Sequence, residues 1–161
     1  MDRRTVILGT ATSVAGSATA ALAWPPERRC DDPRERRNLR VMEEWVDNLV
    51  TGGDNSAFKS PDMTVTTPAA LPYGGTIPDA EYGEALARYW GPPPTPPEGE
   101  PTLFADADRV FLQGTFAATG QPTGLAVEVP LVEVFTLARG LVTNDTLYFL
   151  DLDVILAALD A

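Results

Sequence analysis

A glutamate in the middle of an apolar strand pattern is the first residue that suggests chemistry. Side chains alternate between the two faces of a strand. In residues 125–137 one face carries four large apolar side chains, Val129, Leu131, Phe135 and Leu137. Glu133 lies among them, although charged side chains are rarely buried without a partner. Glu133 is therefore the first candidate for a catalytic group.

A second acid, Asp145, is predicted to face Glu133 from the next strand. A three-residue loop at 138–140, ending in glycine, pairs 137 with 141, 135 with 143 and 133 with 145. Directly opposed acids repel each other, so one of them should keep its proton with a raised pKa. Such a pair can serve as general acid and general base. Alternatively, a bent hairpin lets Asp145 reach water, and a one-residue register change moves it to the other face.

Composition excludes several other kinds of site. The chain has 161 residues, no histidine and one cysteine, Cys30. A Ser-His-Asp or Cys-His device is therefore impossible, and we expect no metal and no cofactor. The net charge is −11, and the 121 residues after position 40 hold four basic and 18 acidic residues. Because such a domain repels phosphate backbones, we expect no nucleic-acid partner.

Residues 1–23 have the pattern of an export signal. A charged start containing Arg3 and Arg4 precedes a weakly hydrophobic run that ends in the small-x-small sequence Ala21-Leu22-Ala23. The paired arginines resemble a twin-arginine signal. We expect a periplasmic or extracellular protein with no stable membrane span after cleavage. The alternative, an uncleaved anchor, is disfavoured by the many Ala, Thr, Ser and Gly residues.

The chain after the signal divides into a linker, residues 24–33, and one domain, residues 34–161. Asp32 and Pro33 provide an N-cap and a first-turn proline for a helix. This helix should end at Gly52 and Gly53. Its apolar stripe consists of Leu39, Met42, Val46, Leu49 and Val50.

The middle of the domain predicts a strand, a loop and a second helix. Residues 63–67 are rich in β-branched side chains and form the expected strand. Residues 71–76 are a loop, and residues 79–90 are expected to be helical. Six of the eleven residues in 91–101 are proline, which makes this segment a stiff loop. It is interpreted as a rigid connector, or alternatively as a lid or a docking peptide.

The C-terminal third predicts an antiparallel meander and a closing helix. Long strands are expected at residues 109–118, 125–137 and 141–150, and a helix follows from Asp151. The fold class is therefore α+β, with helices on one face of an antiparallel sheet.

The order of these segments resembles a known superfamily. The residues that carry the resemblance are Gly53-Asp54, Asp62 to Pro68, Val132 to Gly140, and Tyr148-Phe149 with Asp151. In these features residues 35–160 resemble the nuclear transport factor 2 (NTF2) superfamily, and within it a SnoaL-like domain. The resemblance implies a cone: a strongly curved antiparallel sheet wrapped around helices, with a mostly apolar central pocket. It also implies a homodimer through the outer sheet face.

The catalytic groups of the ketosteroid isomerases in this superfamily are only partly present. Their base aspartate corresponds to Thr67, which cannot act as a carboxylate base. The position of their oxyanion-hole acid corresponds to Glu133. Their tyrosine on the first helix falls near Trp45 or Val46, so its hydroxyl is missing.

This sequence also lacks catalytic residues that other enzymes of the superfamily use. The last-strand aspartate of the limonene-type epoxide hydrolases corresponds to Leu147, and their Arg-x-Asp pair is not evident around residues 112–114. The His-Trp-Asp sequence of the polyketide cyclases is absent.

Two functions remain. The first is binding of a small, mostly apolar molecule without catalysis. The alternative is an isomerase, dehydratase or cyclase that uses Glu133 and Asp145 for proton transfer. The predicted pocket consists of Trp45, Thr67, Tyr73, Tyr89, Trp90, Leu112, Leu131, Phe135, Leu147 and Phe149, although each aromatic residue could equally be ordinary core.

Overall fold

The structure is a computed structural model that describes residues 32–95 and 99–160. The predicted export signal, residues 1–23, and most of the linker, residues 24–33, lie outside the described residues. Within the described ranges no helix is long and apolar enough to cross a membrane.

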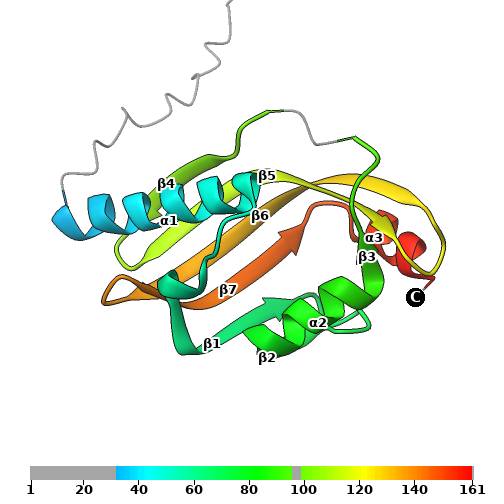
Figure 1. The fold of residues 1–161 in the computed structure, drawn as a ribbon, viewed down its shortest axis with the longest axis horizontal. Helices are drawn as coiled ribbons and strands as arrows, with labels where there is room; N and C mark the ends of the chain where they lie inside the picture. The colour runs from blue at the N-terminus through cyan, green and yellow to red at the C-terminus, as the bar shows by residue number, and fades with distance from the viewer. Residues whose placement is uncertain (1–31, 96–98, 161) are drawn as a thin grey trace, which may run out of the picture.

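Three α-helices and a strongly curled sheet make up the described domain (Figure 1). The helices are α1 (Pro33–Thr51), α2 (Asp79–Tyr89) and α3 (Leu152–Leu159), with a short 3-10 turn at Ser56–Phe58. The strands are β1 (Lys59–Thr67), β2 (Gly75–Pro78), β3 (Trp90–Gly91), β4 (Thr102–Asp106), β5 (Arg109–Gly120), β6 (Ala126–Ala138) and β7 (Leu141–Phe149). The predicted α+β class is confirmed, while β2 and the separate strand β4 were not predicted.

The ends of α1 follow from its capping residues. The Asp32 side chain accepts a hydrogen bond from the Arg34 backbone N–H, and Pro33 occupies the first turn. At the other end, Gly52 adopts the left-handed conformation with φ 74°, which ends the helix at low steric cost. The predicted boundaries are confirmed.

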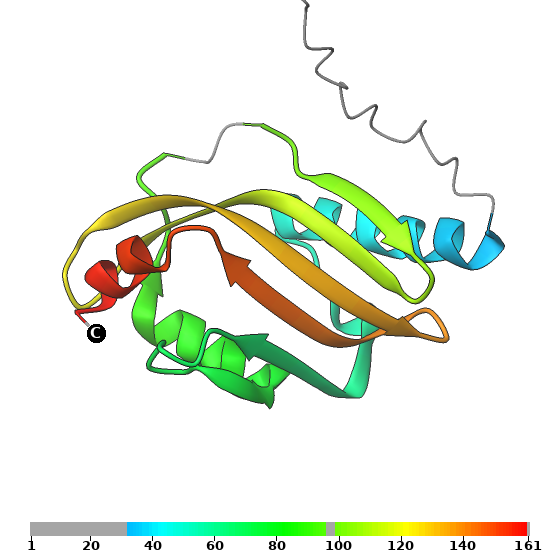
Figure 2. The same ribbon diagram turned by 180° about the vertical axis from the view of Figure 1, so that it is seen from behind.

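The sheet is mixed rather than purely antiparallel. Its strand order is β2-β1-β7-β6-β5-β3, and β4 also pairs with β5. All adjacent pairs are antiparallel except β1 and β7, which run parallel. The prediction of an antiparallel sheet is therefore wrong at this pair: β1 comes from the first half of the chain and joins the meander at its edge by a crossover. Figure 2 shows β5, β6 and β7 as long curved strands.

The β6–β7 hairpin differs from the predicted register. Its turn contains two residues, Arg139 and Gly140, both with positive φ (56° and 83°), and not the predicted three-residue loop 138–140. Such a turn alone would move Asp145 to the opposite face, because it changes the pairing by one residue. A β-bulge follows the turn. Leu137 pairs with Val142, but Thr136 pairs with Asn144, so Thr143 is an extra residue on β7. The bulge returns Asp145 to the apolar face.

All three helices pack on one face of the curled sheet, where two hydrophobic clusters form (Figure 1). The first joins α1 to β5, β6 and β7 through Met42, Trp45 and Phe135, with the Trp45 and Phe135 rings 5.9 Å apart. The second joins α2 and α3 to the far ends of β5 and β6, and includes the fully buried Ile155. The space between α1 and the second cluster is where a pocket can form.

The predicted apolar stripe of α1 is only partly buried. Met42 and Trp45 enter the core, but Leu49 is 63% exposed and Val50 is 80% exposed. The expectation that Leu49 and Val50 belong to the packed face is wrong, because open space separates the last turns of α1 from the sheet.

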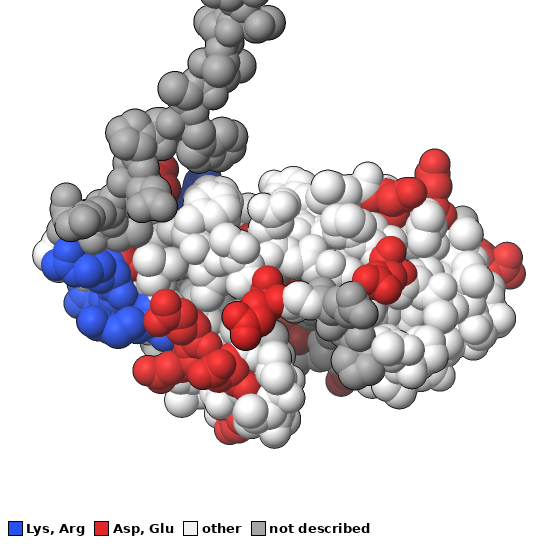
Figure 3. Space-filling model, turned by 90° about the horizontal axis from the view of Figure 1, so that it is seen from above, with Lys and Arg blue, Asp and Glu red and all other residues white. Residues whose placement is uncertain are grey.

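Charge is segregated along α1. Its first half carries Arg34, Arg36, Arg37 and Arg40 with a single acid, Glu35, and its second half carries Glu43, Glu44 and Asp47. This order opposes the helix macrodipole, which favours acidic groups at the N-terminus and basic groups at the C-terminus. Figure 3 shows the basic side chains gathered at one end of the molecule, with acidic side chains beside them. Burial of Met42 and Trp45, together with hydrogen bonds between the side chains of Asn38 and Glu35 and the backbone of Ala107, attaches α1 to the rest of the domain.

Two glycines provide a matched test of the packing at α3. A Cβ added to Gly120 would collide with the carbonyl oxygen of Ala158, whereas a Cβ on Gly83 in α2 would meet nothing within 4 Å. We expect Gly120→Ala to lower the free energy of unfolding by about 1–3 kcal/mol. Gly83→Ala should raise it by about 0.5–1 kcal/mol, because alanine favours the helix. Denaturant unfolding measures both, and equal effects of the two substitutions would contradict the docking of α3.

Candidate functional site

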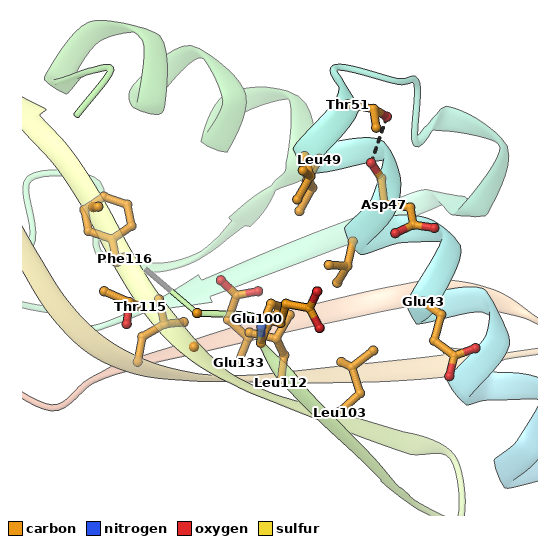
Figure 4. A pocket seen from close by; sticks show the side chains of 17 residues that line it. Glu43, Asp47, Leu49, Thr51, Glu100, Leu103, Leu112, Thr115, Phe116 and Glu133 are labelled. Carbon is orange, nitrogen blue, oxygen red and sulfur yellow. Dashed lines mark hydrogen bonds between the residues drawn. The ribbon is translucent and has the colours of Figure 1, made fainter. Parts of the chain in front are cut away.

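A pocket of about 890 Å³ lies between the second half of α1 and the curled sheet (Figure 4). It is lined by four parts of the chain: α1, the segment 99–103, the middle of β5, and β6. Its apolar lining consists chiefly of Val46, Leu49, Val50, Pro101, Leu103, Leu112, Phe116, Ala117 and Leu131. The exposed positions of Leu49 and Val50 are explained by this pocket, since both side chains form its wall.

Gly114 in the middle of β5 helps to keep the floor of the pocket open. Its neighbours on the same face of the strand, Leu112 and Phe116, both carry large side chains. A Cβ at Gly114 would lie 3.2 Å from the Leu112 Cδ2 atom and 3.5 Å from the Pro101 Cβ atom. Glycine within a strand is typical of a site where another group approaches closely.

Glu133 extends from the floor of this pocket. It lies on β6 opposite Leu112 of β5 and Leu147 of β7. Figure 4 shows its side chain projecting from the sheet. Glu133 makes no hydrogen bond to any described residue. Burial raises the pKa of its carboxyl to about 7, so both protonation states are accessible near neutral pH.

Asp145 lies diagonally across from Glu133, not directly opposite as predicted. It pairs with Phe135 on β6 and with Val65 on β1. The predicted direct opposition is wrong because the two-residue turn and the Thr143 bulge together shift the pairing by two residues. Since the shift is an even number, both acids still project from the same face of the sheet.

The Asp145 carboxyl is buried without a partner. The residue is 7% exposed, and its Oδ1 atom has no hydrogen bond. Burial first, then the negative charges of Glu133 and Asp79, raise the pKa of Asp145 well above its usual range. A buried carboxyl with no donor beside it favours the neutral form, because ionisation would cost its full desolvation energy.

Tyr82 on α2 belongs to the same group and was not among the predicted site residues. Burial raises the pKa of its hydroxyl, and the charges of Glu133 and Asp145 raise it further. The helical spacing of Tyr82, Leu86 and Tyr89 in the sequence predicts that Tyr82 lies on the buried side of α2. Only the fold shows that this side faces the two acids.

No cation lies among the residues that line the pocket, which include no lysine or arginine. Lys59 is bound instead to Asp79, with 2.7 Å between Nζ and Oδ2, and its Nζ lies 5.6 Å from the centre of the Trp45 ring. Within the described residues no group of three or more acidic, histidine or cysteine side chains could hold a metal ion. The carboxyl groups of Glu133 and Asp145 can transfer protons and form hydrogen bonds.

The structure brings together only some of the predicted pocket residues. Leu112 and Leu131 line the pocket beside Glu133. Trp45, Phe135 and Leu147 are buried in the core cluster around α1, where they support the strands that carry the two acids.

The remaining predicted pocket residues surround the second cluster. Tyr73 and Trp90 are buried there and joined by a hydrogen bond of 2.7 Å from Trp90 Nε1 to the Tyr73 hydroxyl. Thr67 donates to the Tyr73 backbone carbonyl, and Tyr89 and Phe149 are partly buried nearby. In this structure none of these five lines the pocket, and a ligand contact at any of them stays a prediction.

Sequence reasoning missed the part of the wall that α1 and the segment 99–103 contribute. The sequence assigns Val46, Leu49 and Val50 to the apolar stripe and Phe116 to a strand with no specific role, and Leu103 lies in β4, which was not predicted. The signal for Leu49 and Val50 was available: adjacent apolar residues widen the stripe beyond what a single sheet contact covers.

Solved structures identify the fold. No protein-family model matches the sequence, and no curated protein matches it. An NTF2-like protein from Burkholderia xenovorans is 20% identical, with a TM-score of 0.60 over 77% of this chain and 96% of that one. A protein described as a SnoaL-like polyketide cyclase from a Jannaschia species is 18% identical, with a TM-score of 0.57 over 81% of this chain and 96% of that one.

TerC, crystallised with polyporic acid, is 20% identical, with a TM-score of 0.61 over 78% of this chain and 99% of that one. The fold is therefore the NTF2-like cone, shared with SnoaL-like proteins. The resemblance predicted from the sequence is confirmed at the level of fold.

The raised pKa of Glu133 has a measurable effect on stability. The pKa of the Glu133 carboxyl is about 7 in the folded protein and 4.5 in its ordinary state. Between these two pH values the folded protein therefore binds more protons than the unfolded chain. The contribution of Glu133 to the free energy of unfolding is full below 4.5 and is lost as the pH rises toward 7. In Glu133→Gln, the decrease between about pH 5 and about pH 8 should be smaller by about 1–3 kcal/mol.

Urea unfolding at several pH values measures this difference. The pKa of Asp145 is also raised, so its ionisation lowers the free energy of unfolding as the pH rises. Some pH dependence should therefore remain in Glu133→Gln. Glu128→Gln, at an exposed position on the same strand, is the matched control and should follow the unmodified protein. Parallel profiles for Glu133→Gln and the unmodified protein would show that Glu133 is ionised in the folded state at neutral pH.

Proposed function

We propose that this protein binds a small, mostly apolar molecule in the pocket between α1 and the sheet. The observation that carries the proposal is the pocket itself: about 890 Å³, walled mainly by aliphatic side chains and Phe116, with Glu133 at its floor. This volume is in the range of small-molecule sites, and a few polar groups in an apolar wall are typical of them.

The fold supports this proposal without specifying the ligand. TerC, which shares the fold, was crystallised with polyporic acid. Proteins that share a fold often differ in chemistry, because function resides in the site. The ligand is therefore argued from the residues of this chain alone.

Proton transfer is a second candidate, favoured by one observation. Glu133 lies in the pocket with its pKa raised to about 7, and the buried, unpartnered Asp145 lies diagonally beside it. A general acid or base works best when its pKa lies near the working pH. Deuterium uptake from D₂O into a bound ketone, lost in Glu133→Gln, would distinguish isomerase, dehydratase or cyclase chemistry from binding alone; no uptake would count against it.

Export and dimerisation are further proposals. The sequence of residues 1–23 supports export, and a shift in gel mobility after secretion, absent when Arg3 and Arg4 are replaced, would test it. A homodimer through the outer sheet face is supported by Phe104 and Tyr148, which lie on that face and are 48% and 55% exposed. A monomeric mass in sedimentation would overturn the dimer.

Binding in the pocket can be tested with N-phenylnaphthylamine, a neutral apolar dye whose fluorescence rises in apolar surroundings. We expect saturable binding of one dye per chain. Gly114→Leu should weaken it by about tenfold or more, because the new side chain would occupy the floor of the pocket. Val46→Trp would fill the same space from α1.

Gln113→Leu is the matched control for Gly114→Leu. Gln113 is the preceding residue of β5, exposed on the outer face of the sheet, so its substitution adds the same side chain outside the pocket. Equal dye affinity in the Gly114, Val46 and Gln113 variants, each with an unchanged circular dichroism spectrum, would exclude this pocket as the binding site.

A further inference from the structure

The pocket has an unbalanced charge. Besides its apolar wall it is lined by four acidic residues, Glu43, Asp47, Glu100 and Glu133, and by no lysine or arginine. Acidic groups on a surface are ordinarily solvated, and three of these four are exposed. The fourth, Glu133, is half-buried among apolar side chains, where a negative charge is costly unless a positive charge accompanies it.

The four acids reach the pocket from three directions. Glu43 and Asp47 lie one turn apart on α1 and therefore project from the same side of the helix. Glu100 lies just before β4, and Glu133 lies on β6 across the cavity from α1 (Figure 4). A group inside the pocket is thus exposed to negative potential from the helix, the rim and the floor.

Asp145 lies near Glu133 but is not among the residues that line the pocket. It projects from the same face of the sheet as Glu133, is 7% exposed, and leaves Oδ1 without a hydrogen bond. Buried polar atoms in proteins are nearly always satisfied, and a neutral carboxyl is the form in which an orphan of this kind costs least. Lys59 is bound to Asp79 and is not among the residues that line the pocket.

We propose that the natural ligand is an organic cation, an amine whose ammonium group binds at Glu133 while its apolar body lies against α1 and β5. This inference rests on the proposed binding function and specifies its ligand class. Val46, Leu49 and Phe116 contact the apolar body. The Phe116 ring can also attract the cation through its face. An anionic ligand is disfavoured, since it would meet the same four acids with no counter-charge.

Binding should release a proton. Several titratable groups face Glu133 and Asp145 when no ligand is bound. Tyr82 and Asp79 face them from α2, and Glu43, Asp47 and Glu100 lie around the cavity. The one basic group among these neighbours, Lys59, is bound to Asp79. An ammonium group at Glu133 favours the ionised carboxylate. The carboxyl O–H bond then breaks, its proton passes to solvent, and a carboxylate–ammonium pair remains.

Three probes with one aromatic body test the charge preference: anthracenylmethylamine, anthracenylmethanol and anthracenecarboxylate. The affinity of each is measured by fluorescence titration at about pH 6. We expect the amine to bind about tenfold or more tighter than the alcohol, the size of a charge-assisted hydrogen bond in a partly buried site. The carboxylate should bind most weakly.

Two variants assign the preference to the pocket. In Glu133→Gln the advantage of the amine over the alcohol should fall to about fivefold or less, which is what the exposed acids alone can supply. Glu44→Gln is the matched control, because Glu44 lies next to Glu43 on α1 but does not line the pocket. It should leave the advantage unchanged, and both variants should keep the circular dichroism spectrum of the unmodified protein.

Calorimetry of the unmodified protein gives a readout that needs no variant. Binding of the amine, measured in buffers with different ionisation enthalpies, should release up to about one proton per chain near pH 6, and the alcohol should release none. Absence of proton release would overturn the pairing with Glu133.

The outcomes separate this inference from the proposed function. If the amine and alcohol bind equally, or the carboxylate binds tightest, the cation proposal fails and the binding pocket stands. If the preference for the amine is the same in Glu133→Gln as in the unmodified protein, the assignment to Glu133 is overturned. If none of the three probes binds, both the cation proposal and the proposed apolar site fail.

Discussion

The bulge at Thr143 determines the face of the sheet on which Asp145 lies. The two-residue turn at Arg139 and Gly140 alone would direct Asp145 outward, where water would solvate its carboxyl. The extra residue restores the inward orientation and places Asp145 diagonally beside Glu133. Bulges next to functional sites commonly re-aim a side chain in this way. Two carboxyls therefore share an apolar face with no cation beside them, and their raised pKa values follow from that placement.

The residues around Glu133 and Asp145 determine how strongly the two acids interact with any group that approaches them. Phe135, Leu112 and Leu147 enclose the acids and lower the local dielectric, which strengthens every electrostatic interaction there. Gly114 and the outer turns of α1 leave the adjacent space unfilled, so a ligand can reach Glu133 from one side. The same absence of packing that exposes Leu49 and Val50 creates the apolar wall. Leu49 and Val50 do not pack against the sheet, and the space left between them and the sheet is the pocket.

Local patterns in the sequence were sufficient for much of the fold, because caps, β-branched runs and strand alternation act over a few residues. Asp32 and Gly52 bounded α1 correctly, and Glu133 was recognised as the exception on an apolar face. The parallel pairing of β1 with β7 could not be derived locally, since the two strands are about 80 residues apart. The bulge at Thr143 has no composition signal of its own, and the closeness of Tyr82 to the acids depends on the docking of α2. The pocket wall from Val46 to Val50 could not be predicted without knowing that a gap separates the second half of α1 from the sheet.

The central claim is that burial in an apolar site raises the pKa values of both Glu133 and Asp145 above their ordinary values. Carbon-13 NMR of the side-chain carboxyl carbons, followed through a pH titration and assigned with Glu133→Gln and Asp145→Asn, measures this directly. Because the two groups interact, two macroscopic steps are expected. We expect Glu133 to titrate with a pKa of about 7 and Asp145 to titrate well above its ordinary value of 3.8. Titration of both carboxyls in their ordinary acidic range, with no step near neutrality, would contradict it.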